Sequence, residues 1–165
     1  MKRVLLALCA VVLTACGAQI DGTPRADEAA AAAYRDEIAA QRKADEDSAK
    51  QVVCGTFQTT ALRATDEYNA LQDANVAGAS DLLDRVSRTA RLLRDSADQV
   101  EQSVDAEDHL RDDLATKFTD YAEASRALAD EVERWPRILK ADDMNRANDQ
   151  RNNTIRAAGG RCDER

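Results

Sequence analysis

The sequence predicts an all-α protein: an antiparallel helical bundle of about four helices with heptad patterning, preceded by a tether and a spacer helix. Two observations support this fold class. Apolar residues recur at alternating spacings of three and four, the pattern by which a helix buries one stripe of its surface. The chain has only 2 prolines and 6 glycines in 165 residues and 4% aromatic residues, which leaves little material for strands and hairpins.

The first element is a leader, residues 1–15. Lys2 and Arg3 form a positively charged start, and an apolar segment of about ten residues follows, as in an export signal. This segment is too short for a membrane-spanning helix, which needs roughly 20 apolar residues. The segment Leu13–Gly17, with the sequence LTACG, then resembles the lipobox of bacterial lipoproteins, in which small residues precede an invariant cysteine.

This resemblance covers the leader alone and implies a lipid anchor. It implies transfer of diacylglycerol to the Cys16 thiol and cleavage between Ala15 and Cys16, with or without acylation of the new amino terminus. Two or three acyl chains, at about 0.8 kcal/mol per buried methylene, hold a protein on a bilayer durably where one chain does not. The expected partner of Cys16 is therefore a membrane, with the chain on its extracytoplasmic side. The alternative is an ordinary secretory signal with a chance cysteine.

A tether and a polar helix come next. Residues 16–26 contain Gly22 and Pro24 and have no periodicity, so we predict a flexible tether. Residues 27–50 are rich in alanine and charged helix-forming residues, and Tyr34 and Ile38 are nearly their only large apolar residues. Such a segment predicts a semi-rigid spacer helix, with a docking helix that uses Tyr34 and Ile38 as the alternative.

The bundle is predicted over residues 51–165, from four apolar stripes. The first stripe comprises Cys54, Phe57, Ala61, Ala64, Tyr68, Leu71 and Asn75. The second comprises Leu83, Val86, Ala90, Leu93, Ala97, Val100 and Val104, after a stop at Gly78 and a helix N-cap at Ser80. The third comprises Leu114, Phe118, Tyr121, Ser125, Leu128, Val132 and Trp135, ended or kinked by Pro136. The fourth comprises Met144, Asn148, Arg151, Ile155 and Ala158.

Two points of this architecture stay open in the sequence. The fourth stripe is half polar, so it predicts either a partly exposed helix or one completed by a partner. The heptad frame passes from the second stripe to the third without slipping. We favour a turn near 104–107, where Asp105 and Asp108 suggest a helix cap, over one continuous helix from 81 to 135.

Two cysteines remain for the fold after Cys16 is assigned to lipid. An exported protein meets oxidising surroundings, so Cys54 and Cys162 are predicted to form a disulfide. In an up-down-up-down bundle both cysteines lie at one end, because Cys54 begins the first core helix and Cys162 follows the last. A metal site is the competing hypothesis, but two cysteines alone lack the further ligands that zinc needs.

One basic cluster recurs at every third residue: Arg85, Arg88, Arg91 and Arg94. It predicts either an interaction site for phosphate-bearing lipids or cell-wall polymer, or a solvated helix face. Four aspartates, Asp81, Asp84, Asp95 and Asp98, each lie four positions from one of these arginines, so intrahelical ion pairs account for all four. Trp135 is likewise either the end of a core stripe or the top of a binding groove.

The sequence contains no recognisable catalytic machinery. His109 is the only histidine and lacks the Glu-x-x-His context of a di-iron bundle, so we predict no metal and no cofactor. Without the leader the chain has 21 basic against 31 acidic residues, which argues against nucleic acid as a partner. We therefore expect a non-catalytic interaction or structural module of the cell envelope, which acts through contacts with a protein or another envelope component. The alternative is a small-ligand or lipid carrier with its pocket near Tyr68, Tyr121 and Trp135.

Overall fold

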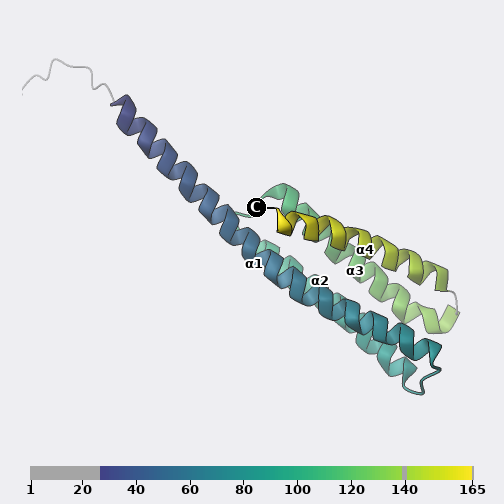
Figure 1. The fold of residues 1–165 in the computed structure, drawn as a ribbon. Coiled ribbons are helices and arrows are strands. Elements are labelled where there is room, and N and C mark those ends of the chain that lie inside the picture. The colour runs from purple at the N-terminus through teal and green to yellow at the C-terminus, as the bar shows by residue number, and fades with distance from the viewer. Residues whose placement is uncertain (1–26, 139–140, 165) are drawn as a thin grey trace, which may run out of the picture. The chain divides into compact units, whose positions relative to one another are not determined.

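The computed structural model describes residues 27–138 and 141–164. The predicted leader, Cys16 and the predicted tether lie outside these residues. The described chain forms four helices, α1 (Glu28–Val76), α2 (Leu82–Asp105), α3 (Asp112–Ile138) and α4 (Ala141–Asp163), and contains no strand (Figure 1). The all-α four-helix bundle is therefore confirmed.

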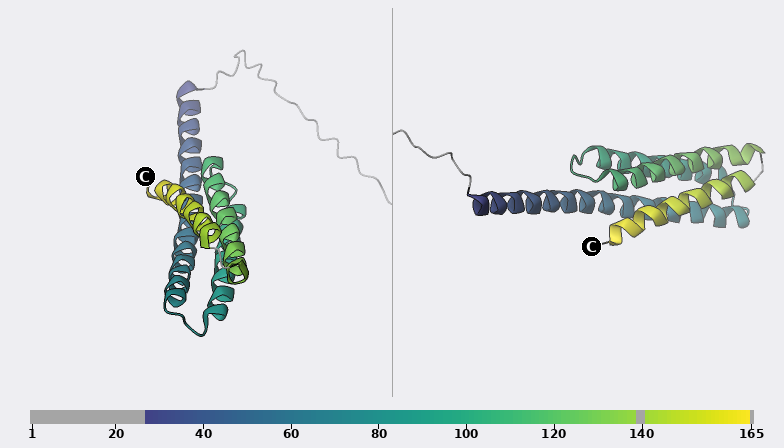
Figure 2. Two further views of the ribbon diagram at one scale, coloured as in Figure 1. Left: turned by 90° about the vertical axis from the view of Figure 1, so that its right-hand side faces the viewer. Right: turned by 90° about the horizontal axis from the view of Figure 1, so that it is seen from above.

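The chain divides into two units, residues 1–36 and residues 37–165. The first helix, α1, begins in the first unit. There the Asp27 carboxylate accepts a hydrogen bond from the Ala29 backbone N–H at 3.0 Å, which satisfies one of the free N–H donors at the start of the helix. Tyr34 in this unit is 65% exposed. The second unit contains the bundle, in which the four helices run alongside one another (Figure 2).

The interior of the bundle consists of two apolar clusters. One cluster comprises Ala64, Tyr68, Leu71, Val86, Ala90, Leu93, Leu128, Ala129, Val132, Trp135 and Met144. The other comprises Val53, Cys54, Phe57, Ala61, Val100, Leu114, Phe118, Tyr121 and Ala158. The Phe57 ring lies 5.3 Å from the Phe118 ring and 5.0 Å, edge-on, from the Tyr121 ring, so α1 and α3 pack directly against each other.

Most residues of the predicted stripes are buried or half-buried, and the exposed exceptions lie at the end of the bundle where α1 passes to α2. All seven residues of the third stripe are buried. Asn75 is exposed, because it lies in the last turn of α1, and Ala74 is buried instead. Leu83 is 67% exposed, and its neighbour Leu82 packs against the core in its place.

The turn between α1 and α2 ends the first helix by a Schellman motif. Gly78 has φ +62°, a left-handed conformation that costs a residue with a Cβ about 1 to 2 kcal/mol. The N–H of Ala79 bonds to the Ala74 carbonyl and the N–H of Gly78 to the Asn75 carbonyl. The predicted stop at Gly78 is thus confirmed. The predicted N-cap at Ser80 is wrong: the cap residue is Asp81, whose side chain makes no capping hydrogen bond.

The break between α2 and α3 is present, so the hypothesis of one helix over 81–135 is wrong. Residues 106–111 separate the two helices, slightly beyond the predicted turn. Asp105 and Asp108 do not cap α3, because that helix begins only at Asp112, with two aspartates in its first turn. Pro136 does not end α3, which continues to Ile138.

The first helix continues through the expected boundary between spacer and bundle. No break in α1 occurs at residues 50 and 51, and Ala49 is already 1% exposed, so burial begins just before that boundary. None of the helices in the described residues is long and apolar enough to cross a membrane.

Candidate functional site

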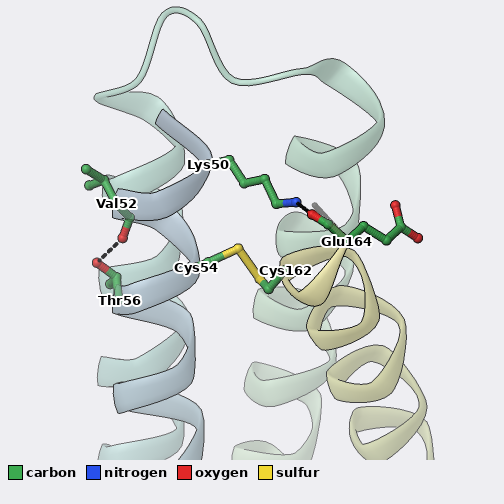
Figure 3. The surroundings of a disulfide bond; sticks show 6 residues. All are labelled: Lys50, Val52, Cys54, Thr56, Cys162 and Glu164. Atoms are coloured by element: carbon green, nitrogen blue, oxygen red, sulfur yellow. Dashed lines mark hydrogen bonds between the residues drawn. A yellow bond between two sulfur atoms is a disulfide. The ribbon is translucent and has the colours of Figure 1, made fainter. Parts of the chain in front are cut away.

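The most distinctive chemistry of the described chain lies at the end of the bundle where α4 finishes beside α1 (Figure 3). A disulfide joins Cys54 of α1 to Cys162 of α4, with 5.7 Å between the two Cα atoms. The predicted pairing is confirmed. Next to it, the Lys50 ammonium group donates a hydrogen bond to the backbone carbonyl of Glu164, just beyond the C-terminus of α4. A cation at that position also interacts favourably with the dipole of α4.

The interior of the bundle holds a fully buried arginine, Arg151 of α4, which is 0% exposed. Its guanidinium donates four hydrogen bonds: to Ser125 Oγ, Thr65 Oγ1 and the Ala61 carbonyl, each at 3.2 Å, and to the Tyr121 hydroxyl at 3.4 Å. All four acceptors are neutral. Within residues 27–138 and 141–164, no carboxylate forms an ion pair with Arg151 within 4.0 Å. Neutral oxygen atoms of α1 and α3 therefore stabilise the buried cation, without a negatively charged partner.

Sequence reasoning placed Arg151 on the fourth stripe but did not predict its burial. A half-polar stripe suggested an exposed helix or a missing partner, whereas the polar residue at its centre points into the bundle. Ile155 and Asn148 on the same stripe are half-buried. The signal that could have identified the site is Ser125 on the third stripe, since a buried hydroxyl needs a hydrogen-bonding partner.

The basic cluster of α2 does not form the predicted set of intrahelical ion pairs. Only Arg85 does so, through Asp81 at 3.0 Å. Arg88 lies 3.8 Å from Glu67 of α1 instead of pairing with Asp84. Arg94 turns to α3, and Arg91 is exposed with no ion pair within 4.0 Å in the described chain. The prediction failed because the sequence gives spacing along one helix but not the neighbouring helices, whose carboxylates compete for the same guanidinium groups.

Two reciprocal ion-pair clusters join α2 and α3, and they follow a repeat that sequence reasoning missed. The motif Arg-x-x-Ala-Asp-x-Val-Glu occurs at residues 94–101 and again at residues 126–133. Arg94 donates to Asp130 and Glu133, both at 2.7 Å. Arg126 donates to Asp98 at 2.7 Å and to Glu101 at 2.6 Å. Because the helices are antiparallel, each motif's arginine meets the other motif's two acids.

These pairs predict a dependence of stability on pH. The hydrogen bonds from Arg126 hold the pKa of Glu101 below its ordinary value. A lowered pKa in the folded state stabilises the protein above the unfolded pKa, near 4.5, and this contribution disappears as the pH falls through the folded value. We expect Arg126→Gln to lower the free energy of unfolding by about 1 kcal/mol or less at pH 7, since both side chains are partly exposed, and by nearly nothing near pH 2.

Urea denaturation between pH 7 and pH 2 checks this expectation. Arg146→Gln is the matched control, because within the described residues Arg146 pairs only with Asp143 of its own helix, and its side chain is 76% exposed. A difference between wild type and Arg126→Gln that stays constant with pH would contradict the assignment.

The aromatic residues proposed to line a carrier pocket belong to the packed core. Tyr121 is 0%, Tyr68 4% and Trp135 8% exposed, so Trp135 closes a core stripe instead of topping a groove. Burial raises the pKa of the Tyr68 hydroxyl, to which Gln72 donates a hydrogen bond at 2.8 Å. None of these three residues lines any of five surface hollows over the described helices.

These five hollows lie along α1. One, of about 950 Å³, follows the groove between α1 and α2 and includes Leu62, which is 65% exposed, together with Arg88 and Arg91 of the predicted interaction cluster. Another, of about 620 Å³, is lined by both cysteines of the disulfide. His109 is exposed in the α2–α3 loop, and the described residues contain no group of histidine, cysteine and acidic side chains that could hold a metal ion.

These features define the class of the protein. It is a four-helix bundle with a buried arginine whose hydrogen-bond acceptors are all neutral, and with a disulfide that joins its first and last helices. The chain belongs to the Rv2240c four-helix bundle domain family, whose model matches residues 37–163. The match begins at the residue that opens the second unit of the structure. Comparison with the curated proteins and with the solved structures finds no match.

Proposed function

We propose that this protein is a bacterial envelope lipoprotein: a helical bundle held on the extracytoplasmic face of a membrane by lipid on Cys16, where it acts through contacts with an envelope partner. The observation that carries the proposal is the sequence LTACG at residues 13–17 after a charged and apolar leader. The disulfide between Cys54 and Cys162 supports it, because such bonds persist in the oxidising surroundings that an exported protein meets.

The arginines of the bundle differ in whether they join helices or remain exposed, and the exposed ones support a role in contacting a partner. Arg94 and Arg126, the best-paired basic residues on the surface, join α2 to α3, and the buried Arg151 holds α4 against α1 and α3. Arg91, the member of the predicted cluster without an ion pair in the described chain, is exposed and lines the groove between α1 and α2 together with the apolar Leu62. The groove is also lined by Asp66, Glu67 and Asp95, so apolar and charged side chains of both signs share it, a composition that suits contact with another protein.

Lipid labelling tests the anchor directly. The full chain is expressed in a bacterial host that is fed an alkyne-modified palmitate, and the purified protein is examined by intact mass. We expect label and a mass increase that corresponds to a diacylglyceryl group on a chain that begins at Cys16. The Cys16→Ala variant should carry no label. A wild-type chain with an unmodified cysteine, or with label that survives Cys16→Ala, would refute the proposal.

Fractionation requires a second variant, because a leader that is not cleaved can itself hold Cys16→Ala in the membrane. In this control, residues 17–165 follow an ordinary secretory leader that is removed by cleavage after export. We expect wild type in the membrane pellet and this control in the soluble extracytoplasmic fraction. Recovery of the control in the pellet would show that something other than lipid holds the bundle there, against the proposed anchor.

A further inference from the structure

The fourth helix contributes little apolar surface to the core. Each of the two core clusters contains only one buried residue of α4, Met144 in one and Ala158 in the other. The third buried residue of α4 is Arg151, which enters the core as a cation. Ala147, Ile155 and Cys162 of α4 also pack against the clusters, but they are only partly buried. The other buried members of both clusters come from α1, α2 or α3. Removing α4 would therefore take one fully buried side chain from each cluster and leave the contacts among the other three helices in place.

The first three helices hold one another without α4. Phe57 of α1 packs on Phe118 and Tyr121 of α3, and the reciprocal pairs of Arg94 and Arg126 join α2 to α3. Besides the apolar contacts of Met144, Ile155 and Ala158, α4 is held by polar and covalent bonds. These are the hydrogen bonds of Arg151, an exposed ion pair from Arg161 to Asp113, and the disulfide. Exposed ion pairs contribute little to stability. The hydrogen bonds of a buried cation to neutral acceptors offset most of the cost of removing the cation from water, so they add little net stability.

The disulfide can be reached from solvent. Both cysteines line the hollow of about 620 Å³, together with Lys43, Asp47, Lys50, Gln51, Gly55, Gln58 and Glu164. Gly55, next to Cys54, has open space where a side chain would stand. Cys54 is 7% exposed, whereas Cys162 is half-buried, so Cys162 is the more accessible partner. The charged groups that face the hollow are two lysines and two acids, so an incoming thiolate meets no net repulsion.

We propose that the Cys54–Cys162 disulfide is a redox latch, and that its reduction by a dithiol releases α4 from a three-helix core of α1, α2 and α3. The thiolate of the dithiol attacks the sulfur of Cys162, the S–S bond breaks, and Cys54 leaves as a thiolate. The second thiol of the reductant then attacks the mixed disulfide and releases Cys162. The protein gains two thiols after protonation, and the dithiol is oxidised to a disulfide.

Release of α4 has a structural consequence. Tyr121 and Ser125 of α3 and Ala61 and Thr65 of α1, which bind the Arg151 guanidinium, would then line an open groove between those helices. The reduced protein would thus expose a surface that the oxidised protein keeps covered. This inference concerns residues 49–164 and holds whether or not Cys16 carries lipid.

Hydrogen exchange followed by mass spectrometry tests the latch on the full chain, with and without dithiothreitol. We expect reduction to speed exchange in peptides from 141–163 by about tenfold or more and to leave them exchanging at least about tenfold faster than peptides from α2 and α3, because α4 can then open while the other three helices stay folded. A single common level of protection in all helices of the reduced protein would overturn the proposal, and so would unchanged exchange in α4.

Two variants make the outcome specific. Cys54→Ser combined with Cys162→Ser should show fast exchange in α4 without reductant and no further change with it. Arg151→Met gives α4 an apolar residue of similar length at its central core position, and the reduced form of this variant should retain more protection in α4 than reduced wild type. A disulfide that resists 10-fold excess dithiothreitol in the folded protein would also overturn the proposal, since a latch must open without unfolding.

Discussion

An Arg151→Ala variant is expected to lose about 3 kcal/mol or more of its free energy of unfolding. Arg151 is among the largest fully buried side chains of the bundle, so truncation leaves a cavity between α1, α3 and α4. It also removes the donors to Ser125 and Tyr121, buried groups that cannot turn to water. Urea denaturation at pH 7, followed by circular dichroism, measures the loss.

Arg151→Met is the matched control for this prediction. Methionine fills much of the same volume without a charge. Three of the four acceptors keep other partners: the Thr65 hydroxyl donates to the Ala61 carbonyl at 2.7 Å, and the Tyr121 hydroxyl lies 2.7 Å from Ser96 Oγ. We therefore expect this variant to be within about 1 kcal/mol of wild type, because replacing a buried charged group by an apolar one of similar volume is often nearly neutral. A loss as large as that of Arg151→Ala would contradict this account.

The second large effect is expected from the disulfide. Cys54 and Cys162 are separated by 108 residues, and closing a loop of this length restricts the unfolded chain by about 5 kcal/mol in the chain-entropy model. That value is a large part of the 5 to 15 kcal/mol by which small domains are stable. Cys54→Ala combined with Cys162→Ala should lower the free energy of unfolding accordingly, measured in urea without reductant.

Two controls separate the covalent bond from the loss of side chains. Wild type in dithiothreitol should reach the same stability as the double variant, because both lack the bond. The Cys16→Ala variant, altered outside the bundle, should retain the stability of wild type. If the double variant unfolded within about 1 kcal/mol of the oxidised protein, the disulfide would contribute no more than an ordinary contact.

The agreement between prediction and structure is greatest where burial follows from one helix alone. The third stripe, from Leu114 to Trp135, is buried as predicted, because a regular apolar period leaves a helix one face to bury. The predicted pairing of Cys54 and Cys162 holds because helix lengths and antiparallel order bring both to one end. Boundaries were less accurate: α3 begins at Asp112, later than the acidic residues near 105 suggested.

Polar pairing could not be predicted in the same way. The sequence offers each arginine of α2 an acid four residues away, yet Arg94 pairs with α3, and Asp98, the acid four residues from Arg94, pairs with Arg126. Competition among carboxylates depends on which helix lies alongside, and spacing along one helix does not contain that information. The repeat shared by residues 94–101 and 126–133 does indicate which arginine pairs with which acids, but only once the two helices are known to be antiparallel neighbours.

The sequence by itself determined the helical class, the apolar stripes and the two cysteines available for a disulfide, since these depend on local periodicity and on residue type. Only the tertiary structure decided that Arg151 lies inside the bundle and that α2 and α3 exchange ion pairs. The physical reason is that a buried charge is tolerated only where acceptors from other helices converge on it, and such convergence is a property of the packed helices together.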